Sequence, residues 1–381
     1  MKQRWTFRCY PNNYQQKELN KVFGCCRYVY NWALSERTKA FKDGKRMNYN
    51  QSSAALTKLK KDSEHIWLNE VSCVPVQQSL RHLQTAFVNF FEKRTGYPSF
   101  KKKSHRQGAE FTRSAFKYDS GNCNLVISKI GRIKIKWSRV LPSYPTTVTI
   151  IKNPSGRWFV SFVIEATDKK FPKTKLAVGI DFGISRLATL STGEHIANPK
   201  HLAKKDKRLR WAQRQLARKQ KGSKRYNHWR KYVAKLHEKV SDSRKDAIEK
   251  FTTDVVKRFA LICIEDLHIR GMVKNHNLAR SLSDAAIGFA SRKLAEKSER
   301  YGKNIVKIDR FFPSSKMCNL CGCINEKLLL SDRVWTCGHC HAVHDRDDNA
   351  SKNILAVGQT VTARGAGVRA VRTFVRKASL Q

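Results

Sequence analysis

Two pairs of cysteines in residues 316–355 constrain the possible folds of this chain more than any other feature of its sequence. Cys318 and Cys321 form one CxxC pair, Cys337 and Cys340 form another, and fifteen residues separate them. Each pair places two thiolates on one tight turn, and two such turns supply the four sulfurs that tetrahedral zinc requires. We therefore expect this segment to fold around one structural zinc ion.

Neighbouring residues offer alternative ligands for this metal. Cys323 extends the first pair to CxxCxC and could replace Cys321. The histidines in or beside the second pair are further alternatives: His339, His341 and His344. The symmetric set of four cysteines is the most economical choice, because both halves then follow the same CxxC pattern.

The other six cysteines do not indicate a disulfide scaffold. The opening MKQRWTFRCYPNNY has no apolar segment resembling a secretory signal, and no uninterrupted apolar run is long enough to span a bilayer. We therefore expect a reducing, cytoplasmic compartment and no membrane partner. In that setting the following residues are expected to be free thiols: Cys9, Cys25, Cys26, Cys73, Cys123 and Cys263.

The charge of the chain indicates the class of its partner. There are 76 Lys and Arg against 30 Asp and Glu, a formal net charge of +46. This excess is far larger than solubility requires and suits a surface that neutralises phosphates, so nucleic acid is the expected ligand. A ribosomal or chromatin protein could be equally basic. However, 381 residues with 40% hydrophobic content predict two or three folded domains of an enzyme-sized protein.

The N-terminal part has the pattern of a β-domain that carries helices. Residues 4–10 alternate as in a strand, and helical patterns follow. From 124 to 165, short β-rich segments separated by glycines and prolines predict a small antiparallel barrel or sheet. If the first strand pairs with them, the helical region is an insertion. The basic loop at 99–106, with its aromatic neighbours, is a candidate for binding phosphates and stacking on bases, although a solvated charge run has the same composition.

Strands and helices alternate from residue 173 onward. LAVGIDFGISRLATLSTG predicts a strand, a glycine turn and a second strand, and RFALICIEDL and NIVKID predict two more strands. Residues 204–231 hold thirteen Lys or Arg and a single acid. Apolar residues recur there at helical spacing, so we expect two long helices joined near 221–223, with a positive outer surface for nucleic acid. A non-specific basic coiled coil is the alternative.

Three acids lie where strands or a helix start would hold them rigid: Asp181 in VGIDFG, Glu265 in ICIEDL and Asp347 in DRDDNAS. Carboxylates that approach phosphate need cations between them, and oxygen ligands suit magnesium. Two such ions can activate water and stabilise a departing oxygen, which implies phosphodiester hydrolysis. Structural alternatives exist: Asp181 could cap the glycine turn, Glu265 could pair with a lysine, and Asp347 or Asp345 could cap a helix. The segment 269–280 is a candidate loop that gates access to these acids.

The order of these motifs resembles the TnpB (OrfB) family of transposon-encoded proteins, which are relatives of type V CRISPR nucleases. The resemblance rests on GIDFG, IEDL, SSKMCNLCG, TCGHC and DRDDNAS, with YPNNYQQKELNKVFGCCRYVYNWAL and GYPSFKKK, and it covers nearly the whole chain. It implies an α+β multidomain protein: a RuvC-like, ribonuclease-H-type nuclease domain with an inserted zinc ribbon, and a β-barrel wedge domain carrying a helical recognition insertion. The expected ranges are 1–10 for the first wedge strand, 11–118 for the recognition domain, 119–172 for the wedge barrel, 173–312 and 344–356 for the RuvC-like domain, 313–343 for the zinc ribbon, and 357–381 for a basic disordered tail.

The resemblance also implies roles for the three acids. Asp181, Glu265 and Asp347 match the catalytic positions that bind magnesium, two ions in all. The family pattern places the third acid two residues before the asparagine of DRDDNAS, which selects Asp347. Asp345 is then the second choice, and Asp348 falls at a variable position.

The implied activity is RNA-guided cleavage of double-stranded DNA in a prokaryotic cytoplasm, by a monomer with its RNA. A structured RNA from the transposon end would bind the protein, its guide segment would pair with one DNA strand, and protein side chains would read a short flanking motif. Holding an RNA scaffold, a heteroduplex and a displaced strand accounts for the charge. The loop at 99–103 and the preceding helix, near Gln77 and Gln78, are the expected places where the flanking motif is read.

One segment departs from the family pattern. After KVSDSRKDA, family members commonly carry a histidine and a lysine, whereas this chain has Glu249 and Lys250. No metal position is affected, so we expect the difference to concern helix packing or the grip on nucleic acid.

Three other functions account for part of the sequence. A guide-dependent DNA-binding repressor would have no need of the intact carboxylates. A transposase proper, or an accessory protein of transposition, would act in strand joining. A zinc-ribbon RNA-binding protein would explain the charge and the cysteines but not GIDFG and IEDL.

Overall fold

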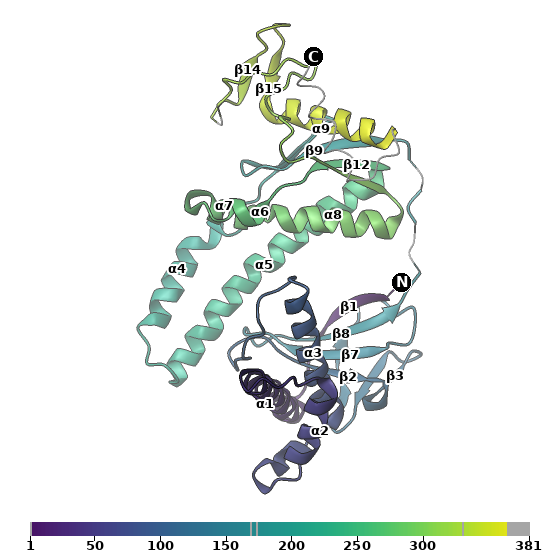
Figure 1. The fold of residues 1–381 in the computed structure, drawn as a ribbon, viewed down its shortest axis with the longest axis vertical. Coiled ribbons are helices and arrows are strands. Elements are labelled where there is room, and N and C mark those ends of the chain that lie inside the picture. The colour runs from purple at the N-terminus through teal and green to yellow at the C-terminus, as the bar shows by residue number, and fades with distance from the viewer. Residues whose placement is uncertain (1, 168–169, 173, 330, 364–381) are drawn as a thin grey trace. The chain divides into compact units, whose positions relative to one another are not determined.

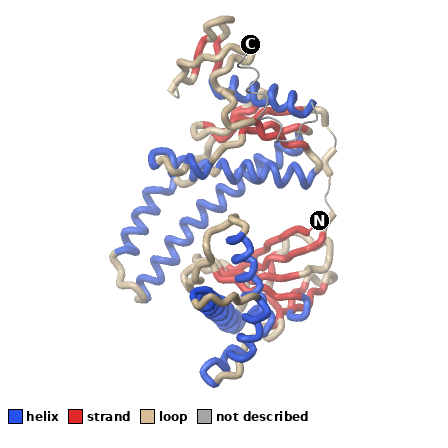
Figure 2. Tube along the Cα trace, viewed as in Figure 1, coloured by secondary structure: helices blue, strands red, loops and turns tan. Residues whose placement is uncertain are grey.

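The computed structural model describes residues 2–167, 170–172, 174–329 and 331–363. These residues form an α+β protein that divides into two compact units, one ending at residue 167 and one following it (Figures 1 and 2). Each unit has its own sheets and its own hydrophobic core. Within the described ranges, none of the helices combines the length and the hydrophobicity needed to cross a membrane.

The first unit is built on a five-stranded antiparallel sheet in the order β2-β7-β8-β1-β6. β1 pairs with β8 along its whole length, from Lys2 opposite Glu165 to Cys9 opposite Trp158. The expected pairing of the N-terminal strand with the later β-rich segments is therefore confirmed. The strands are β1 (Lys2–Cys9), β2 (Gln107–Thr112), β6 (Ile135–Lys136), β7 (Thr147–Lys152) and β8 (Trp158–Glu165).

The helices between β1 and β2 are an insertion in this sheet, as expected. The first helix starts with a capping box: the backbone N–H of Gln15 donates to Asn12 Oδ1 at 2.9 Å, and the N–H of Asn12 donates to Gln15 Oε1 at 3.0 Å. Further along, Leu80 and Leu83 face the core. The elements are α1 (Asn13–Lys42), α2 (Tyr49–Leu59), the 3-10 helix η1 (Ser63–Asn69) and α3 (Cys73–Phe91).

The helical segment is shorter than the sequence suggested. The helices end at Phe91, and β2 already belongs to the large sheet although it lies inside the range 11–118 expected for the helical domain. β2 is an edge strand in which only Ala109 and Phe111 are buried. Its alternation is therefore weak in the sequence, and its assignment depends on pairing with β7.

A second antiparallel sheet, in the order β3-β4-β5, shares the core of the first unit. Tyr118 and Trp137 lie against Phe162, with ring centroids 6.1 and 5.4 Å apart, respectively. The described pairings give two separate sheets, and the closed barrel expected here stays a prediction. The strands are β3 (Phe116–Asp119), β4 (Asn124–Ile127) and β5 (Gly131–Ile133), and a short 3-10 turn, η2 (Arg113–Ala115), precedes them.

The second unit contains a five-stranded mixed sheet in the order β11-β10-β9-β12-β13. β9, β12 and β13 are parallel, whereas β10 and β11 return antiparallel. The predicted hairpin and the two later strands are all confirmed. The strands are β9 (Ala177–Asp181), β10 (Arg186–Leu190), β11 (His195–Ala197), β12 (Leu261–Glu265) and β13 (Asn304–Ile308).

Helices cover both faces of this sheet, as Figure 1 shows. Successive side chains of a strand point to opposite faces. Ile262 and Ile264 therefore join the core made with α5 and α8, while Cys263 packs with α9 on the other face. The helices are α5 (Lys224–Arg258), α8 (Ile287–Tyr301) and α9 (Arg346–Ala363).

α9 is longer than the sequence predicted. It continues to Ala363, so residues 357–363, expected in the disordered tail, are helical. Residues 364–381 lie outside the described part. Gly358 is one source of the error, because a glycine near a chain end suggests a break. Here its missing side chain instead lets α9 approach β12, since a methyl group would overlap Cys263 Sγ.

The predicted basic hairpin is confirmed. α4 (Ala203–Ala217) and α5 are joined by residues 218–223, and Leu209, Ala212 and Leu236 are buried between them. The predicted loop at 269–280 is wrong: it is largely helical, in α6 (Ile269–Met272) and α7 (His276–Ala285). Leu282, in the second half of α7, is buried in the core of the unit, and this burial stabilises the helix in an otherwise polar segment.

The cysteine-rich segment is a small ribbon with its own core. β14 (Val334–Thr336) pairs antiparallel with β15 (Val343–Asp345), and β15 leads directly into α9. Trp335 and His344 face each other across the hairpin, with ring centroids 4.8 Å apart. The buried core of the ribbon consists of Cys318, Leu328, Trp335 and Cys337.

Candidate functional site

Asp181 and Glu265 lie at the carboxyl ends of two neighbouring parallel strands. β9 and β12 are in register up to Ile180 opposite Ile264, so the next residue on each strand is the acid. The three residues before each acid are buried, which fixes the backbone, while the acid itself is half-buried. Neighbouring strands lie about 4.8 Å apart. The two carboxylates therefore meet at one edge of the sheet.

Asp347 approaches the same edge from the first turn of α9. The helix crosses β9 at Gly179, where any side chain would overlap the backbone of Ser351 and Leu355. Asp347 lies about one helical turn before Ser351. The close contact between helix and strand thus brings the third acid near the other two.

The pKa of Asp181 agrees with the proximity of the three acids. Burial, the charge of Glu265 and the charge of Asp347, in decreasing order, raise the pKa of Asp181 to about 8, and Arg346 and Arg333 act in the opposite direction. Burial also raises the pKa of Glu265. The negative charges of Glu265 and Asp347 thus act on Asp181, which makes the three acids a candidate site for binding cations.

The acids of DRDDNAS have different surroundings. Asp345 Oδ1 accepts hydrogen bonds from the backbone N–H groups of Asp347, at 2.9 Å, and Asp348, at 3.1 Å, and Asp345 Oδ2 lies 3.4 Å from Arg186 Nη1. Asp345 therefore caps α9. Asp348 Oδ1 lies 3.7 Å from His195 Nε2. These contacts favour Asp347 over Asp345 as the acid that faces the sheet.

The contacts around Asp181 and Glu265 differ from the structural roles that were the alternatives for these two acids. Glu265 Oε1 accepts a hydrogen bond from Ser314 Oγ, where a lysine was the alternative partner. The turn after Asp181 is closed by the backbone, since Gly183 N–H donates to the Leu187 carbonyl at 3.4 Å. Ser314 was not apparent from the sequence, because it lies 49 residues beyond Glu265.

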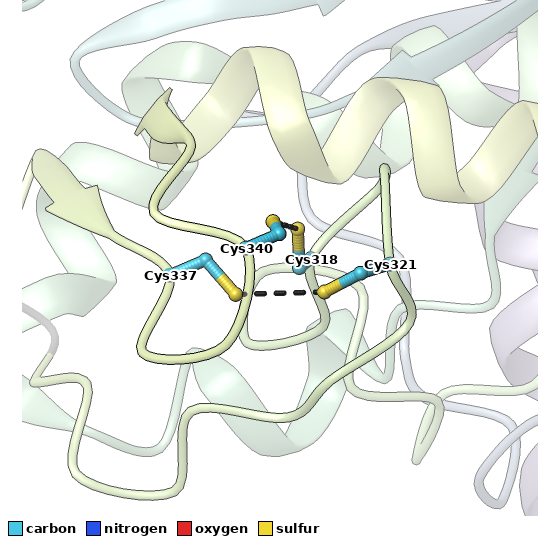
Figure 3. A group of neighbouring side chains, drawn as sticks. All are labelled: Cys318, Cys321, Cys337 and Cys340. Atoms are coloured by element: carbon cyan, nitrogen blue, oxygen red, sulfur yellow. Dashed lines mark hydrogen bonds between the residues drawn. The ribbon is translucent and has the colours of Figure 1, made fainter.

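The four predicted zinc ligands converge in the ribbon (Figure 3). The sulfurs of Cys318, Cys321, Cys337 and Cys340 all lie within 4.8 Å of one another. Two of the Sγ–Sγ separations are 3.6 Å, between Cys318 and Cys340, and 3.5 Å, between Cys321 and Cys337. Four sulfurs about 2.3 Å from a central zinc are about 3.8 Å apart in a tetrahedron. The cluster therefore fits a zinc ion.

Local backbone contacts support this ligand set. Backbone N–H groups of Cys340 and His339 donate to the Cys337 sulfur and lower the pKa of that thiol to about 6. His344 is not one of the four converging residues, but its Nε2 lies 3.1 Å from Cys318 Sγ, beside the cluster. Cys323 and His339 form a separate group with Cys321, so they remain outside the four-sulfur set.

Two asparagines that the sequence analysis missed fasten the ribbon to α9. Asn349 Nδ2 donates to the Met317 carbonyl at 2.7 Å, and its Oδ1 accepts from the N–H of Asn319 at 2.9 Å. Asn353 Nδ2 donates to the carbonyls of Ser314, at 2.8 Å, and Met317, at 2.6 Å. Both asparagines are buried. Their spacing of four residues on one helix face was the available signal in the sequence.

Basic side chains cover the outside of the α4–α5 hairpin. Eleven of the thirteen Lys and Arg between 204 and 231 are exposed, as the positive-surface prediction requires. In the first unit, the loop at 99–103 lies against α1, where Asn31 Oδ1 accepts from the Lys101 N–H at 2.8 Å. Gln77 is exposed on α3, and Gln78 is half-buried.

Comparison with protein families gives three matches along the chain. The OrfB model of IS605-type elements, described as "Probable transposase", matches residues 161–276. A model described as "Cas12f1-like, TNB domain" matches residues 290–354, and a "Helix-turn-helix domain" matches residues 1–46. In this structure residues 2–46 contain β1 and the single long helix α1, so the third description does not fit the fold of that segment.

Relatives match over nearly the full length. A Streptomyces pristinaespiralis protein named "Putative RNA-guided DNA endonuclease" is 48% identical, over 99% of this chain and 94% of its own. The Escherichia coli protein named "Putative RNA-guided DNA endonuclease InsQ" is 30% identical, over 97% of this chain and 96% of its own. In fold, the chain resembles the protein in the "Cryo-EM structure of the Cas12f1-sgRNA-target DNA complex", with a TM-score of 0.54 and 13% identity, over 93% of this chain and 98% of that one. The chain therefore belongs to the TnpB (OrfB) family of transposon-encoded RNA-guided DNA endonucleases.

Proposed function

We propose that this protein hydrolyses phosphodiester bonds of DNA at a divalent-metal site made by Asp181, Glu265 and Asp347, after an RNA guide has paired with the target. The observation that carries the proposal is that Asp181 and Glu265 end neighbouring parallel strands, while α9, which carries Asp347 in its first turn, packs against β9. The names of the full-length relatives support the choice of an RNA-guided DNA endonuclease.

The donor set fits magnesium. All three candidate ligands are carboxylates, and hard oxygen ligands are what magnesium prefers. Burial and mutual repulsion disfavour ionisation of Asp181, as its raised pKa indicates, so bound cations would relieve a charge cluster that is unfavourable by itself. Two magnesium ions bound here would supply the charge needed to activate water and to stabilise the leaving oxygen. The ribbon cysteines would hold one zinc ion whose role is structural.

The residues around the acids would orient them for this chemistry. Ser314 fixes one oxygen of Glu265 by its hydrogen bond. Asp345 caps α9 and thereby holds the first helical turn, which carries Asp347. Arg333 Nη1 lies 3.5 Å from Asp347 Oδ1 and is exposed, so it can also contact a phosphate of the bound strand.

The partners we propose are a structured guide RNA from the transposon end and double-stranded target DNA. The net charge of +46 and the exposed cations of the α4–α5 hairpin support contacts to many phosphates. The loop at 99–103 and the helix near Gln77 and Gln78 remain our candidates for reading the flanking motif. The bacterial relatives support action in a bacterial cytoplasm, and we propose a monomer with its RNA as the working unit.

The test is cleavage by the full-length protein loaded with its copurifying RNA, in magnesium, with and without the change Asp181→Asn. We expect the variant to lose cleavage but to keep RNA-dependent DNA binding, because asparagine has the size of the carboxylate and lacks its charge. Glu296→Gln is the matched control, since that acid is exposed and pairs with Lys293 on the surface of α8. Equal cleavage by the two variants would reject the proposal.

The same experiment separates the other functions. Guide-dependent binding by the wild type without any cleavage would identify a repressor. Joined DNA products formed without RNA would identify a transposase. RNA binding without any DNA affinity would leave only a zinc-ribbon RNA-binding protein.

A further inference from the structure

Phe311 is an exposed aromatic residue on the loop that passes the candidate site. Its side chain is 83% exposed, more than that of any other phenylalanine among the described residues. The loop leaves β13 at Ile308, which pairs with Glu265, and reaches Ser314, which bonds to the Glu265 carboxylate. Phe311 therefore lies three residues from each anchor, within about 10 Å of chain length.

The loop is held in place, so the exposure of Phe311 does not arise from a lack of structure around it. The N–H of Phe311 donates to Asp309 Oδ1 at 2.7 Å, and the N–H of Ser314 donates to the Phe312 carbonyl at 2.8 Å. Phe312 packs on the core beside Cys263. The loop thus packs Phe312 partly against the core and leaves Phe311, the residue before it, exposed.

Arg310 adjoins Phe311 in the chain, and Arg333 lies beside one of the candidate acids. Arg310 Nη2 lies 2.5 Å from Asp266 Oδ2, which fixes the arginine beside the exposed phenylalanine. Arg333 belongs to the surroundings of the same acids, through Asp347. Aromatic rings next to positive charges are the combination with which proteins bind single-stranded nucleic acid, by stacking on bases and neutralising phosphates.

We propose that Phe311 is a stacking platform for an unpaired base of the DNA strand being cut, and that stacking places the adjacent phosphate over the carboxylates. The base must be unpaired because both faces of a base inside a duplex are already covered by its neighbours. The short distance along the loop to Glu265 puts this base about one or two nucleotides from the scissile phosphate. The inference rests on the proposed function for the identity of the strand.

Photocrosslinking tests the platform directly. The full-length Asp181→Asn protein, loaded with its copurifying RNA, is bound to target DNA in which 5-iododeoxyuridine replaces one base at a time. Irradiation joins this base to an aromatic ring stacked on it, and mass spectrometry locates the attached residue. We expect crosslinks to Phe311 at one position or two adjacent positions, close to the cut that the wild type makes.

Three variants complete the test. Phe311→Leu keeps an apolar side chain without a ring and is expected to lose the crosslink and to weaken binding of the single-stranded segment about five-fold or more. Phe311→Trp is expected to retain both. Phe41→Ala removes a ring that is 77% exposed in the other unit and is expected to leave the crosslink unchanged. Because Phe311 is exposed, all three proteins should melt as the parent does.

Crosslinking that persists in Phe311→Leu, or that never reaches residue 311 at any position, would overturn the platform. These outcomes are separate from a failure of the proposed function. Cleavage that depends on Asp181 without a crosslink would refute only the platform. A wild type that does not cleave but crosslinks through Phe311 would refute only the hydrolytic role of the acids.

Discussion

Adding one methyl group at Gly179 should disturb the candidate site from beneath α9. A Cβ atom at this position would lie 2.7 Å from the backbone nitrogen of Leu355 and would overlap the Ser351 carbonyl oxygen. These are backbone atoms of α9, so no side-chain rotation can relieve the overlap. Ordinary contact begins at 3.4 Å. To restore ordinary contact the helix must retreat by 0.7 Å, the difference between 3.4 and 2.7 Å, and by more near Ser351.

The magnitude follows from this displacement. Overpacking of a well-packed core costs about 1–3 kcal/mol, which lowers the melting temperature by about 2–12 °C for a unit of this size. The retreat also carries Asp347 away from Asp181. Because a misplacement of about 1 Å can cost about 100-fold in rate, we expect Gly179→Ala to reduce RNA-guided cleavage by about 10- to 100-fold.

The assay is thermal unfolding together with single-turnover cleavage of the guide-matched DNA. Gly288→Ala is the control in the same unit, because its new Cβ would lie 3.5 Å from Ile269 Cγ1, an ordinary contact. It should leave cleavage unchanged and stabilise the unit by up to about 1 kcal/mol, since alanine favours helix more than glycine does. If Gly179→Ala matched this control in both measurements, the reasoning about α9 would be refuted.

Three further perturbations test other parts of the structure. Lys297→Met should lower the free energy of unfolding by about 2–4 kcal/mol, because the buried ammonium lies 2.6 Å from Glu249 Oε2 and donates to the Glu249 carbonyl at 2.8 Å. Adding Glu249→Gln should recover part of this loss, and no recovery would argue against the ion pair. Cys337→Ser should lower zinc content and melting temperature together, so unchanged zinc would show a wrong ligand set. Without added magnesium, the wild type should lose stability as pH rises from about 4 to 8, since its folded state binds the Asp181 proton, with a pKa of about 8, more tightly than the unfolded state does; an equally steep pH profile for Asp181→Asn would contradict this.

The parts of the fold that were predictable from the sequence are those whose signal is local. β9, β12 and β13 each contain a run of apolar residues bounded by turns, and the α4–α5 hairpin keeps apolar residues at helical spacing despite its charge. The cysteine pairs specify their own turns. Such patterns depend on nearest neighbours in the chain, so a single sequence contains them.

The errors concern segments whose structure depends on distant partners. β2 is a strand because β7 lies beside it, and the helices at 269–285 are stabilised by the buried end of α7. Gly358 looked like part of a mobile tail, but it is the point at which α9 touches Cys263. None of these contacts involves residues near in sequence, so neither periodicity nor turn chemistry could reveal them.

A contact between distant segments also explains why this chain differs from the family pattern at Glu249. Its carboxylate pairs with Lys297, and Lys297 Nζ also donates to Thr252 Oγ1 and Thr253 Oγ1, both at 2.8 Å. The residue therefore joins α5 to α8, which agrees with the expectation that helix packing is affected. The partner is 48 residues away in the sequence. Lys250 instead pairs with Asp246 on the exposed surface of α5.

In the candidate site, too, some residues were predictable from the sequence and others were not. The sequence singled out Asp181, Glu265 and Asp347, whereas the groups that hold them come from contacts between distant segments. Asn349 and Asn353 tie α9 to the backbone of 314–319, and Ser314 in that segment bonds to Glu265. One helix is therefore fastened at once to the zinc-binding ribbon and to the sheet. The cysteine cluster therefore affects more than the stability of the ribbon. If the ribbon unfolds, α9 loses contacts that position Asp347, and the segment that carries Ser314 loses contacts that position Glu265. The geometry of the acids thus depends on the metal-binding fold beside them.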